Sequence, residues 1–215
     1  MDVVVFGAAG PTGKLVCEQA LDAGYSVRAV TRRPDPFPLA GAEALRVVRA
    51  DVASGEGVDE AVADADAVLS VLGAPYQRRA VSVYSAGTRS IVEALRTRGR
   101  GRRLVVVSSG LTFPPPKGSG WFADSIVFPF LRNVPGRTLY ADMRRMETYL
   151  NGCDDLDWTV MRPGRLTNGA TVSAYRLDPD HPSQGTTSRA DLAAAMVAEL
   201  GPGGHVRAAV APSTR

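Results

Sequence analysis

The chain has 215 residues, of which 45% are hydrophobic and 22% charged, and its formal net charge is +3. These values are typical of one globular domain and exclude a disordered chain, a collagen and a coiled coil. No apolar run reaches the ~18 residues of a membrane span, and the N-terminus lacks the basic segment of a signal peptide. We therefore expect a cytoplasmic protein with no membrane partner, in which the two cysteines serve as small apolar residues.

Short β-branched runs alternate with amphipathic patterns along the chain. The expected strands are residues 3–6, 27–30, 46–48, 67–71, 104–107, 158–161 and 206–211, and the expected helices are 12–23, 58–63, 80–95, 140–150 and 190–200. Runs that are apolar throughout are typical of parallel strands buried on both faces. The pattern predicts an α/β fold with a doubly wound parallel sheet and helices on both faces, in one domain over residues 1–215.

Two irregular segments interrupt this alternation. Residues 111–137 are rich in proline and glycine and follow the end of a strand, where doubly wound sheets place ligands. We interpret this segment as a wall or lid over the substrate rather than as packing alone, and residues 168–187 as a second insertion that closes the same cleft. The aromatic residues expected near the substrate are Phe113, Trp121, Phe122 and Phe128. They favour a flat, apolar substrate.

The strongest motif follows the first strand. Three glycines, Gly7, Gly10 and Gly13, precede the first helix with the spacing G-x-x-G-x-x-G. Such glycines permit a tight turn, close approach of a pyrophosphate and close packing of helix on strand, and the helix N-terminus favours the negative charge. The residues expected to contact a dinucleotide here are Gly7, Ala9, Gly10, Pro11, Thr12 and Gly13.

The end of the second strand indicates which dinucleotide binds. An acidic residue about 20 positions past the loop would bind the 2′-hydroxyl of NAD. Arg32 and Arg33 stand there instead. Guanidinium groups suit a 2′-phosphate through bidentate bonds, so NADP (NADPH) is the expected cofactor.

Further contacts are expected after the third and fourth strands. Asp51 can accept from the adenine amino group while the amide of Val52 bonds the ring, and a helix N-cap at Asp51 is a compatible alternative. Leu72 and Gly73 follow the fourth strand, where a glycine lets the backbone approach the ribose.

A run of arginines lies between residues 96 and 103. It has no interleaved aromatic residues, which nucleic-acid patches commonly show. We interpret it as a solvated loop after a helix and expect no nucleic-acid partner.

Seven short runs carry a resemblance to a known family. They are residues 7–13, 31–34, 51–52, 107–110, 140–147, 161–167 and 188–192. In these runs the chain resembles the atypical short-chain dehydrogenases/reductases, specifically the NmrA-like and biliverdin/flavin-reductase-like NAD(P)-binding group. The resemblance implies a Rossmann-type fold with a small C-terminal substrate region. It also implies that Ser108 and Pro163 lie against the cofactor, with Pro163 in the turn beside the nicotinamide.

The catalytic positions depart from the family pattern. Short-chain reductases commonly use a tyrosine with a lysine four residues later, whereas here Arg144 follows Tyr140 at that spacing. Arginine supplies positive charge but cannot relay a proton. The resemblance makes Ser109 the substrate-side serine, so the catalytic candidates are Ser109, Tyr140 and Arg144. The alternatives are a Tyr140 hydroxyl in water, an Arg144 ion pair with Glu147 or Asp142, and a Ser109 that only caps backbone.

These observations predict an NADPH-dependent reductase that transfers a hydride to an aromatic or polycyclic ketone, an enone, a quinone or a flavin. One alternative is an NADP-binding regulator of the NmrA type without turnover. Another is an epimerase, isomerase or dehydratase that recycles NADP internally. We expect no metal, a small aromatic or polycyclic substrate, and a monomer or homodimer.

Overall fold

The computed structural model describes residues 1–32, 37–39, 42–116, 120–169, 171–183 and 185–214. Its central sheet has eight strands, in the spatial order β3 (Leu45–Arg49), β2 (Ser26–Thr31), β1 (Asp2–Phe6), β4 (Ala67–Ser70), β5 (Arg103–Val107), β6 (Asp157–Met161), β10 (Ala208–Ser213) and β8 (Arg176–Pro179). All neighbours pair in parallel except β10 and β8, which are antiparallel. The order confirms the doubly wound, Rossmann-type α/β fold.

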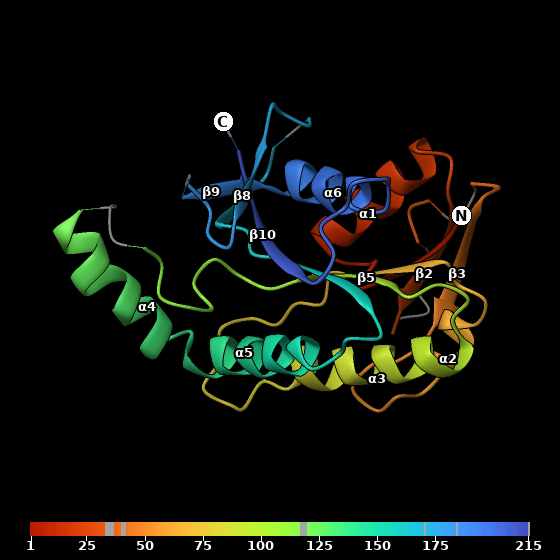
Figure 1. Ribbon diagram of the computed structural model, residues 1–215, viewed down its shortest axis with the longest axis horizontal. Helices are drawn as coiled ribbons and strands as arrows, with labels where there is room; N and C mark the ends of the chain where they lie inside the picture. The colour runs from red at the N-terminus through yellow and green to blue at the C-terminus, as the bar shows by residue number, and fades with distance from the viewer. Residues whose placement is uncertain (33–36, 40–41, 117–119, 170, 184, 215) are drawn as a thin grey trace.

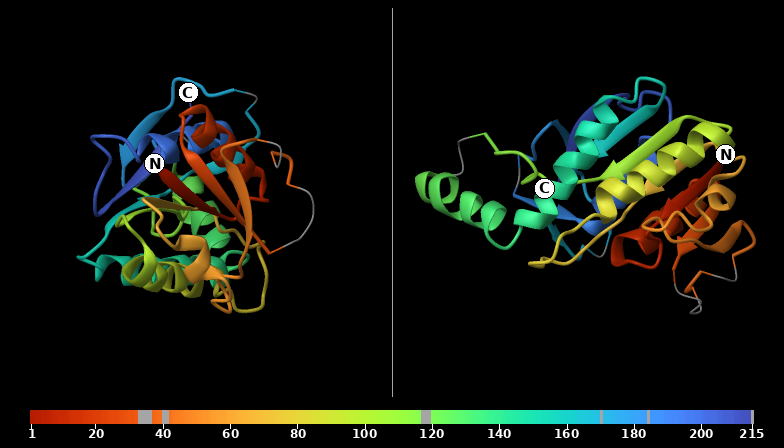
Figure 2. Two further views of the ribbon diagram at one scale, coloured as in Figure 1. Left: turned by 90° about the vertical axis from the view of Figure 1, so that its right-hand side faces the viewer. Right: turned by 90° about the horizontal axis from the view of Figure 1, so that it is seen from below.

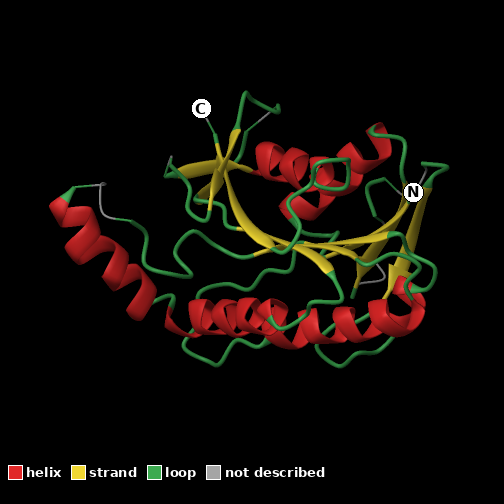
Figure 3. Cartoon of the chain, viewed as in Figure 1, coloured by secondary structure: helices red, strands yellow, loops and turns green. Residues whose placement is uncertain are grey.

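Helices cover both faces of this sheet (Figures 1 and 3). One face carries α1 (Pro11–Asp22) and α6 (Arg189–Ala198), and the other carries α2 (Val58–Val62), α3 (Val83–Arg98) and α5 (Arg137–Asn151). The alternation of β1 explains the two cores, because Val3 and Val5 belong to the apolar cluster with α1 and α6, whereas Val4 and Phe6 belong to the cluster with α3 and α5. Both faces of the central strands are therefore buried.

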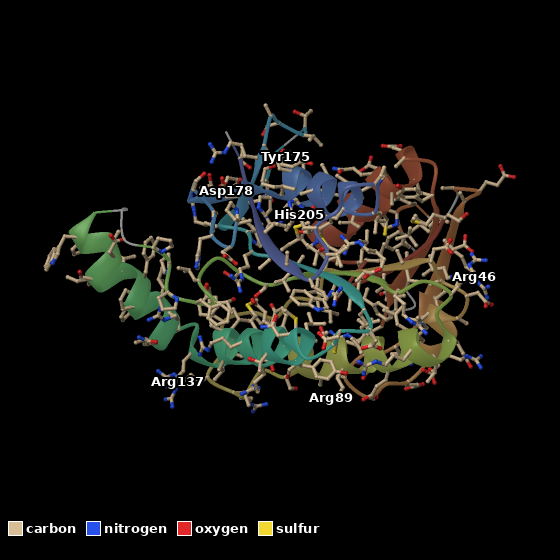
Figure 4. The ribbon with its side chains drawn as sticks, viewed as in Figure 1. Arg46, Arg89, Arg137, Tyr175, Asp178 and His205 are labelled. Atoms are coloured by element: carbon tan, nitrogen blue, oxygen red, sulfur yellow. The ribbon has the colours of Figure 1, made fainter. Side chains whose placement is uncertain are left out.

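The helices α3 and α5, which pack side by side on one face of the sheet, are also in contact at their outer surface. The Arg89 guanidinium of α3 lies 4.4 Å from the ring centroid of Tyr149 on α5. Figure 4 labels Arg89 on the outer side of α3. This cation–π contact links the two helices away from the core.

The segment after β5 departs most from our expectation. We expected a loop over residues 111–137, but the structure contains a π-helix, η1 (Ala123–Val127), and the helix α4 (Phe128–Asn133). This pair projects away from the body of the protein (Figures 1 and 2). Trp121 is 74% exposed there and Phe122 62% exposed. An apolar helical sequence thus forms an arm rather than a closed lid.

Most of the predicted elements lie within three residues of their observed bounds. The last strand begins two residues later than we predicted, at Ala208. The short parallel strands β7 (Arg165–Thr167) and β9 (Thr186–Ser188), together with β8, were absent from the sequence prediction. Strands of three or four residues with mixed polarity show no clear periodicity in the sequence. They are therefore recognised only in the folded structure.

The arginine run between residues 96 and 103 begins in the last turn of α3 and ends at the start of β5, and it is bonded mainly to the protein itself. Arg96 pairs with Asp155 at 2.6 Å, Arg100 with Asp66 at 2.8 Å, and Arg103 with Glu199 at 3.0 Å. Both cysteines, Cys17 and Cys153, are buried free thiols. In the described parts of the chain, no helix has the length and apolar character to span a membrane.

Candidate active site

One large cavity opens at the carboxyl ends of the parallel strands. Its volume is about 1820 Å³, and it is lined by the loops that follow β1 to β6 and by the turn after β8. Small-molecule pockets usually measure about 300–1,000 Å³. This cavity therefore has room for a dinucleotide and a second ligand side by side, at the place where the strand order reverses.

The glycine loop shows why small residues are required on the cofactor side. Gly7 has a φ of +79°, and a Cβ there would lie 2.5 Å from the Val71 carbonyl oxygen at the end of β4. A Cβ at Gly13 would collide with the Gly7 carbonyl oxygen. Gly10 is the N-cap of α1 and provides no side-chain cap for its amides. These features fit a pyrophosphate. Its oxygens would accept hydrogen bonds from the N–H groups at the start of the helix that have no partner within the helix.

The predicted cofactor residues surround this part of the cavity. Those that line it are Gly7, Ala9, Gly10, Pro11, Thr12, Gly13, Arg32, Asp51, Val52, Leu72, Gly73, Ser108 and Pro163. The remaining one, Arg33, lies outside the described residues. Their contacts with a bound cofactor stay a prediction.

Asp51 does not cap a helix. The N-cap of α2 is Gly57, so the alternative that we considered for Asp51 is wrong. The Asp51 carboxylate instead accepts from the Ala53 amide at 2.9 Å, and its main chain forms a bridge with Glu56. This turn fixes the carboxylate in the cavity wall, and its Oδ2 accepts no hydrogen bond from the described residues.

Three hydroxyl groups meet on the other side of the cavity. The Tyr140 hydroxyl lies 2.7 Å from that of Tyr76, and their rings are 6.2 Å apart at an angle of 67°. Tyr140 also hydrogen-bonds Ser109. All three residues line the cavity, and Tyr140 is only 2% exposed. The alternative of a Tyr140 hydroxyl in water is therefore wrong.

The surroundings of Tyr140 keep its hydroxyl protonated. Burial is the largest cause that raises its pKa above the ordinary value, and the hydrogen bond with Tyr76 raises it further. The bond with Ser109 acts in the opposite direction but is weaker. Tyr140 is thus a hydrogen-bond donor at neutral pH, and it lacks the lowered pKa that a nearby lysine gives the tyrosine of short-chain reductases.

Arg144 is turned toward the backbone of the loop after β5. Its Nη1 donates to the Thr112 carbonyl oxygen at 2.9 Å, and Arg144 is not among the described residues that line the cavity. The ion pairs that we considered as an alternative are wrong, because Asp142 pairs with Arg145 and Glu147 with Arg162. The contact gives Arg144 a positioning role at this loop; a direct catalytic role stays a prediction.

A buried polar network lies under the substrate side. Ser108 donates to Glu147 Oε1 at 2.5 Å, and Arg162 Nη2 donates to Glu147 Oε2 at 2.5 Å. The Arg162 guanidinium also lies 4.8 Å from the centroid of the Phe113 ring. The network joins the ends of β5 and β6 to α5, so the Ser108 hydroxyl is already engaged with protein. Ser108 can therefore contact a cofactor only through its main chain and its Cβ atom.

The apolar wall differs from the one that we expected. Of the four predicted aromatics, Phe128 lines the cavity, whereas Trp121 and Phe122 are exposed on the arm and Phe113 packs against Arg162. The observed apolar lining on this side includes Phe128, Leu131, Leu139 and Met143. A helical arm turns only one side toward the cavity, which the composition of the segment could not show.

Two tyrosines that line the cavity escaped the sequence analysis. Tyr76 bonds Tyr140 as described, and Tyr84 accepts a hydrogen bond from the Ala74 amide at 3.1 Å. Tyr76 belongs to the stretch between β4 and α3, where the sequence carries no motif beyond Gly73, and Tyr84 lies in the first turn of α3. Among the described residues, no group of histidine, cysteine, aspartate and glutamate side chains is suited to hold a metal ion.

The fold and the glycine loop define an NAD(P)-binding protein of the Rossmann type. Residues 7–201 match the model of a family described as NAD(P)H-binding, and the chain belongs to that family. It is 31% identical over 212 residues to an uncharacterized chloroplastic protein of Arabidopsis thaliana, covering 92% of this chain and 70% of that protein. The NAD(P)-binding family that the resemblance implied is confirmed.

Solved structures share the whole architecture. A Streptococcus pneumoniae protein described as a candidate NADH-flavin reductase superposes with a TM-score of 0.80 at 22% identity, covering 100% of both chains. A candidate epimerase from Bacteroides thetaiotaomicron gives a TM-score of 0.76 at 26% identity, covering 99% of this chain and 96% of that one. The shared fold thus extends over the complete described chain.

Proposed function

We propose that this protein is an NADPH-dependent reductase that transfers a hydride to a flat, apolar acceptor. The acceptor is an aromatic or polycyclic ketone, an enone, a quinone or a flavin. One observation carries the proposal: a single cavity joins the glycine loop to an apolar chamber that contains the Tyr76–Tyr140–Ser109 hydroxyls. A cofactor and an acceptor can therefore meet within it.

The residues of the chain have distinct parts in this chemistry. When bound, the nicotinamide supplies the hydride. The glycine loop and the start of α1 bind the pyrophosphate. Tyr140 and Ser109 donate hydrogen bonds to the oxygen of the acceptor and hold a proton for it, and the apolar lining at Phe128 and Leu131 orients a flat ring and excludes water.

Arg32 supports the preference for NADPH over NADH. It lines the cavity at the end of β2, is exposed, and has no acidic residue beside it in the sequence. We expect the Arg32→Ala variant to bind NADPH about tenfold more weakly, because a charge-assisted bond to phosphate is worth about 1.5–3 kcal/mol before solvent competes. NADH binding should remain unchanged, which separates loss of the phosphate contact from loss of the fold.

Acceptor-dependent oxidation tests the reaction. Purified protein is mixed with NADPH and then with menadione, FMN or a polycyclic ketone, and the absorbance of NADPH at 340 nm is followed. A decrease that depends on both protein and acceptor supports the reductase. Tight NADPH binding without oxidation by any acceptor would favour the NmrA-type regulator.

A second candidate function has its own support. The structural neighbour from Bacteroides thetaiotaomicron is described as a candidate epimerase, and such chemistry can reuse one NADP molecule in each turnover. NADP that stays bound through purification, together with turnover without net loss of NADPH, would favour an epimerase, isomerase or dehydratase.

We also propose a location and an assembly state for the protein. The raised pKa of the Cys17 thiol, which burial lifts to about 12, keeps this group unreactive. We propose a cytoplasmic monomer or homodimer with a small aromatic substrate and without nucleic-acid or membrane partners. Cell fractionation and light scattering would check the location and the assembly.

A further inference from the structure

His181 occupies a defined position on the substrate side of the cavity. It lies in the turn after β8 and lines the cavity wall. The next residue, Pro182, packs against the loop after β5, since a Cβ at Gly110 would lie 2.8 Å from Pro182 Cδ. Gly110 directly follows Ser109. The packing therefore holds His181 beside the loop that carries Ser109.

The turn that carries His181 is fixed from both sides. Asp178, labelled on β8 in Figure 4, accepts from the Ser183 amide at 2.7 Å and from the Ser213 hydroxyl at 2.6 Å. Asp180 has a φ of +59°, and Arg162 Nη1 lies 3.3 Å from its carboxylate. A left-handed non-glycine residue persists only where its surroundings hold it. The backbone that carries His181 is thus held, through Asp180, by the same Arg162 that binds Glu147.

The two nitrogens of the His181 ring lie in different surroundings. Nδ1 is a buried atom without a hydrogen-bond partner among the described residues, and Nε2 is not such an atom. A neutral imidazole carries its proton on one nitrogen only. A proton on Nδ1 would be a buried, unpaired donor, so we assign the proton to Nε2 of this ring, which lines the cavity.

We propose that His181 recognises a carbonyl oxygen of the acceptor, to which Nε2–H donates a hydrogen bond. This inference rests on the proposed reductase function and narrows its substrate to flat molecules with an oxygen at this wall, such as quinones, polycyclic ketones and flavins. The same contact orients the acceptor carbonyl toward the Tyr140 and Ser109 hydroxyls. His181 is therefore a substrate-binding residue that sequence motifs do not mark.

The charged groups around the turn are already paired or solvated. Arg176 pairs with Asp178, and Arg162 bridges Asp180 and Glu147. Arg189 at the start of α6 donates to Asn168 at 2.6 Å, and Arg165 is exposed at the cavity wall. None of the contacts given for these groups in the described chain reaches the His181 ring, so a ligand oxygen meets no competing protein acceptor there.

Ring-nitrogen NMR tests the assignment in the wild-type protein. The chain has two histidines, and the His181→Gln variant identifies the His181 signals. We expect the pattern of an Nε2-protonated ring, and a shift of its Nε2 signal when menadione is added in the presence of NADP⁺. An Nδ1-protonated ring, or an Nε2 signal that menadione leaves unchanged, would overturn the proposal.

A matched pair of ligands isolates the hydrogen bond. Menadione carries two carbonyl oxygens, and 2-methylnaphthalene is nearly the same shape without them. In His181→Ala with NADP⁺, we expect the Kd of menadione to rise about tenfold, the value of one hydrogen bond, while the Kd of 2-methylnaphthalene is unchanged. Equal changes for both ligands would mean that His181 contributes packing alone, and this would overturn the proposal.

The second histidine provides the control. His205 pairs with Glu199 at 2.8 Å and is not among the described residues that line the large cavity. His205→Gln should leave the Kd of menadione as in the wild type. NADPH titration separates the role of His181 from the proposed function. We expect His181→Ala to bind NADPH as the wild type does. A wild-type protein that binds no NADPH would overturn the proposed function, and the NMR shift with menadione would still decide the role of His181.

Discussion

The two halves of the cavity are built in different ways. The cofactor half is made mainly of backbone and small residues from one short loop, Gly7 to Gly13, at the end of β1. The substrate half is made of side chains from distant parts of the chain: Tyr76 and Tyr140 are 64 residues apart, and Ser108 and Glu147 are 39 apart. A loop that binds phosphate needs local geometry, whereas a chamber that holds a varied acceptor needs the whole fold.

Breaking the buried network of the substrate half should have the largest effect. In Glu147→Ala, the largely buried Arg162 keeps only its longer contact with Asp180, and Ser108 loses its bond to the carboxylate. Removing one partner of a buried ion pair costs about 3–5 kcal/mol, so the free energy of unfolding in urea should fall by that amount. The exposed pair Arg96–Asp155 gives the control, since Asp155→Ala should cost less than about 1 kcal/mol. Similar losses in both variants would contradict the burial argument.

The cofactor half can be blocked without such a loss. Gly10→Val places a branched side chain at the start of α1, where a pyrophosphate would approach. We expect the affinity for NADPH and NADH to fall by about 100-fold, in line with the loss of several main-chain contacts. Gly152→Val, at the end of α5, is the matched control and should bind both normally. Equal affinity in the two variants would refute the glycine-loop site.

Acid should weaken the contacts of Asp178 in the substrate half. Burial tends to raise the pKa of Asp178, but hydrogen bonds from Arg176, Ser183 and Ser213 outweigh it and hold the pKa below the ordinary value. A carboxylate whose pKa is lowered in the folded state contributes stability above the unfolded pKa of about 3.9, and this contribution is lost as the pH falls further.

The Asp178→Asn variant measures that contribution. Its free energy of unfolding at pH 7 should be lower than the wild type by about 1.5–3 kcal/mol, the range for hydrogen bonds to a charged group. The difference should shrink as the pH falls below about 4, because the wild-type carboxyl is then increasingly protonated. A difference that does not change between pH 7 and pH 2 would show that the charge of Asp178 has no part in it.

The smallest expected effect concerns the hydroxyl cluster. Tyr76→Phe removes the partner of Tyr140 at 2.7 Å while the ring contact is kept. The loss of one hydrogen bond should cost about 1 kcal/mol of stability. The pKa of Tyr140 should decrease, because the bond with Tyr76 raises it, and an ultraviolet titration of the phenol would show this. An unchanged titration would contradict the coupling of the two hydroxyls.

The contrast between the halves also explains what the sequence could predict. The glycine spacing and the alternation of strands and helices lie within short windows, so the fold and the conformation of the glycine loop followed from local rules. Ser188 follows a local rule of the same kind, because its hydroxyl caps α6 by accepting from the Asp191 amide at 3.0 Å.

The substrate side could not be predicted in the same way. Tyr76 and His181 lie in stretches without periodicity, and their roles arise because Tyr140 and Gly110 pack against those stretches. The exposed arm at Trp121 illustrates the opposite error, since its aromatic composition suggested a wall of the cavity. Composition says that a segment will bury apolar surface somewhere, but not against which part of the molecule.

The central claim is that the cavity binds NADPH at the glycine loop, and a direct titration tests it. NADPH and NADH are added in separate experiments to the wild-type protein, and the fluorescence of the nicotinamide is recorded. The account predicts saturable binding of one cofactor per chain, with NADPH bound about tenfold more tightly than NADH because of Arg32. No saturable binding of either cofactor would contradict the account.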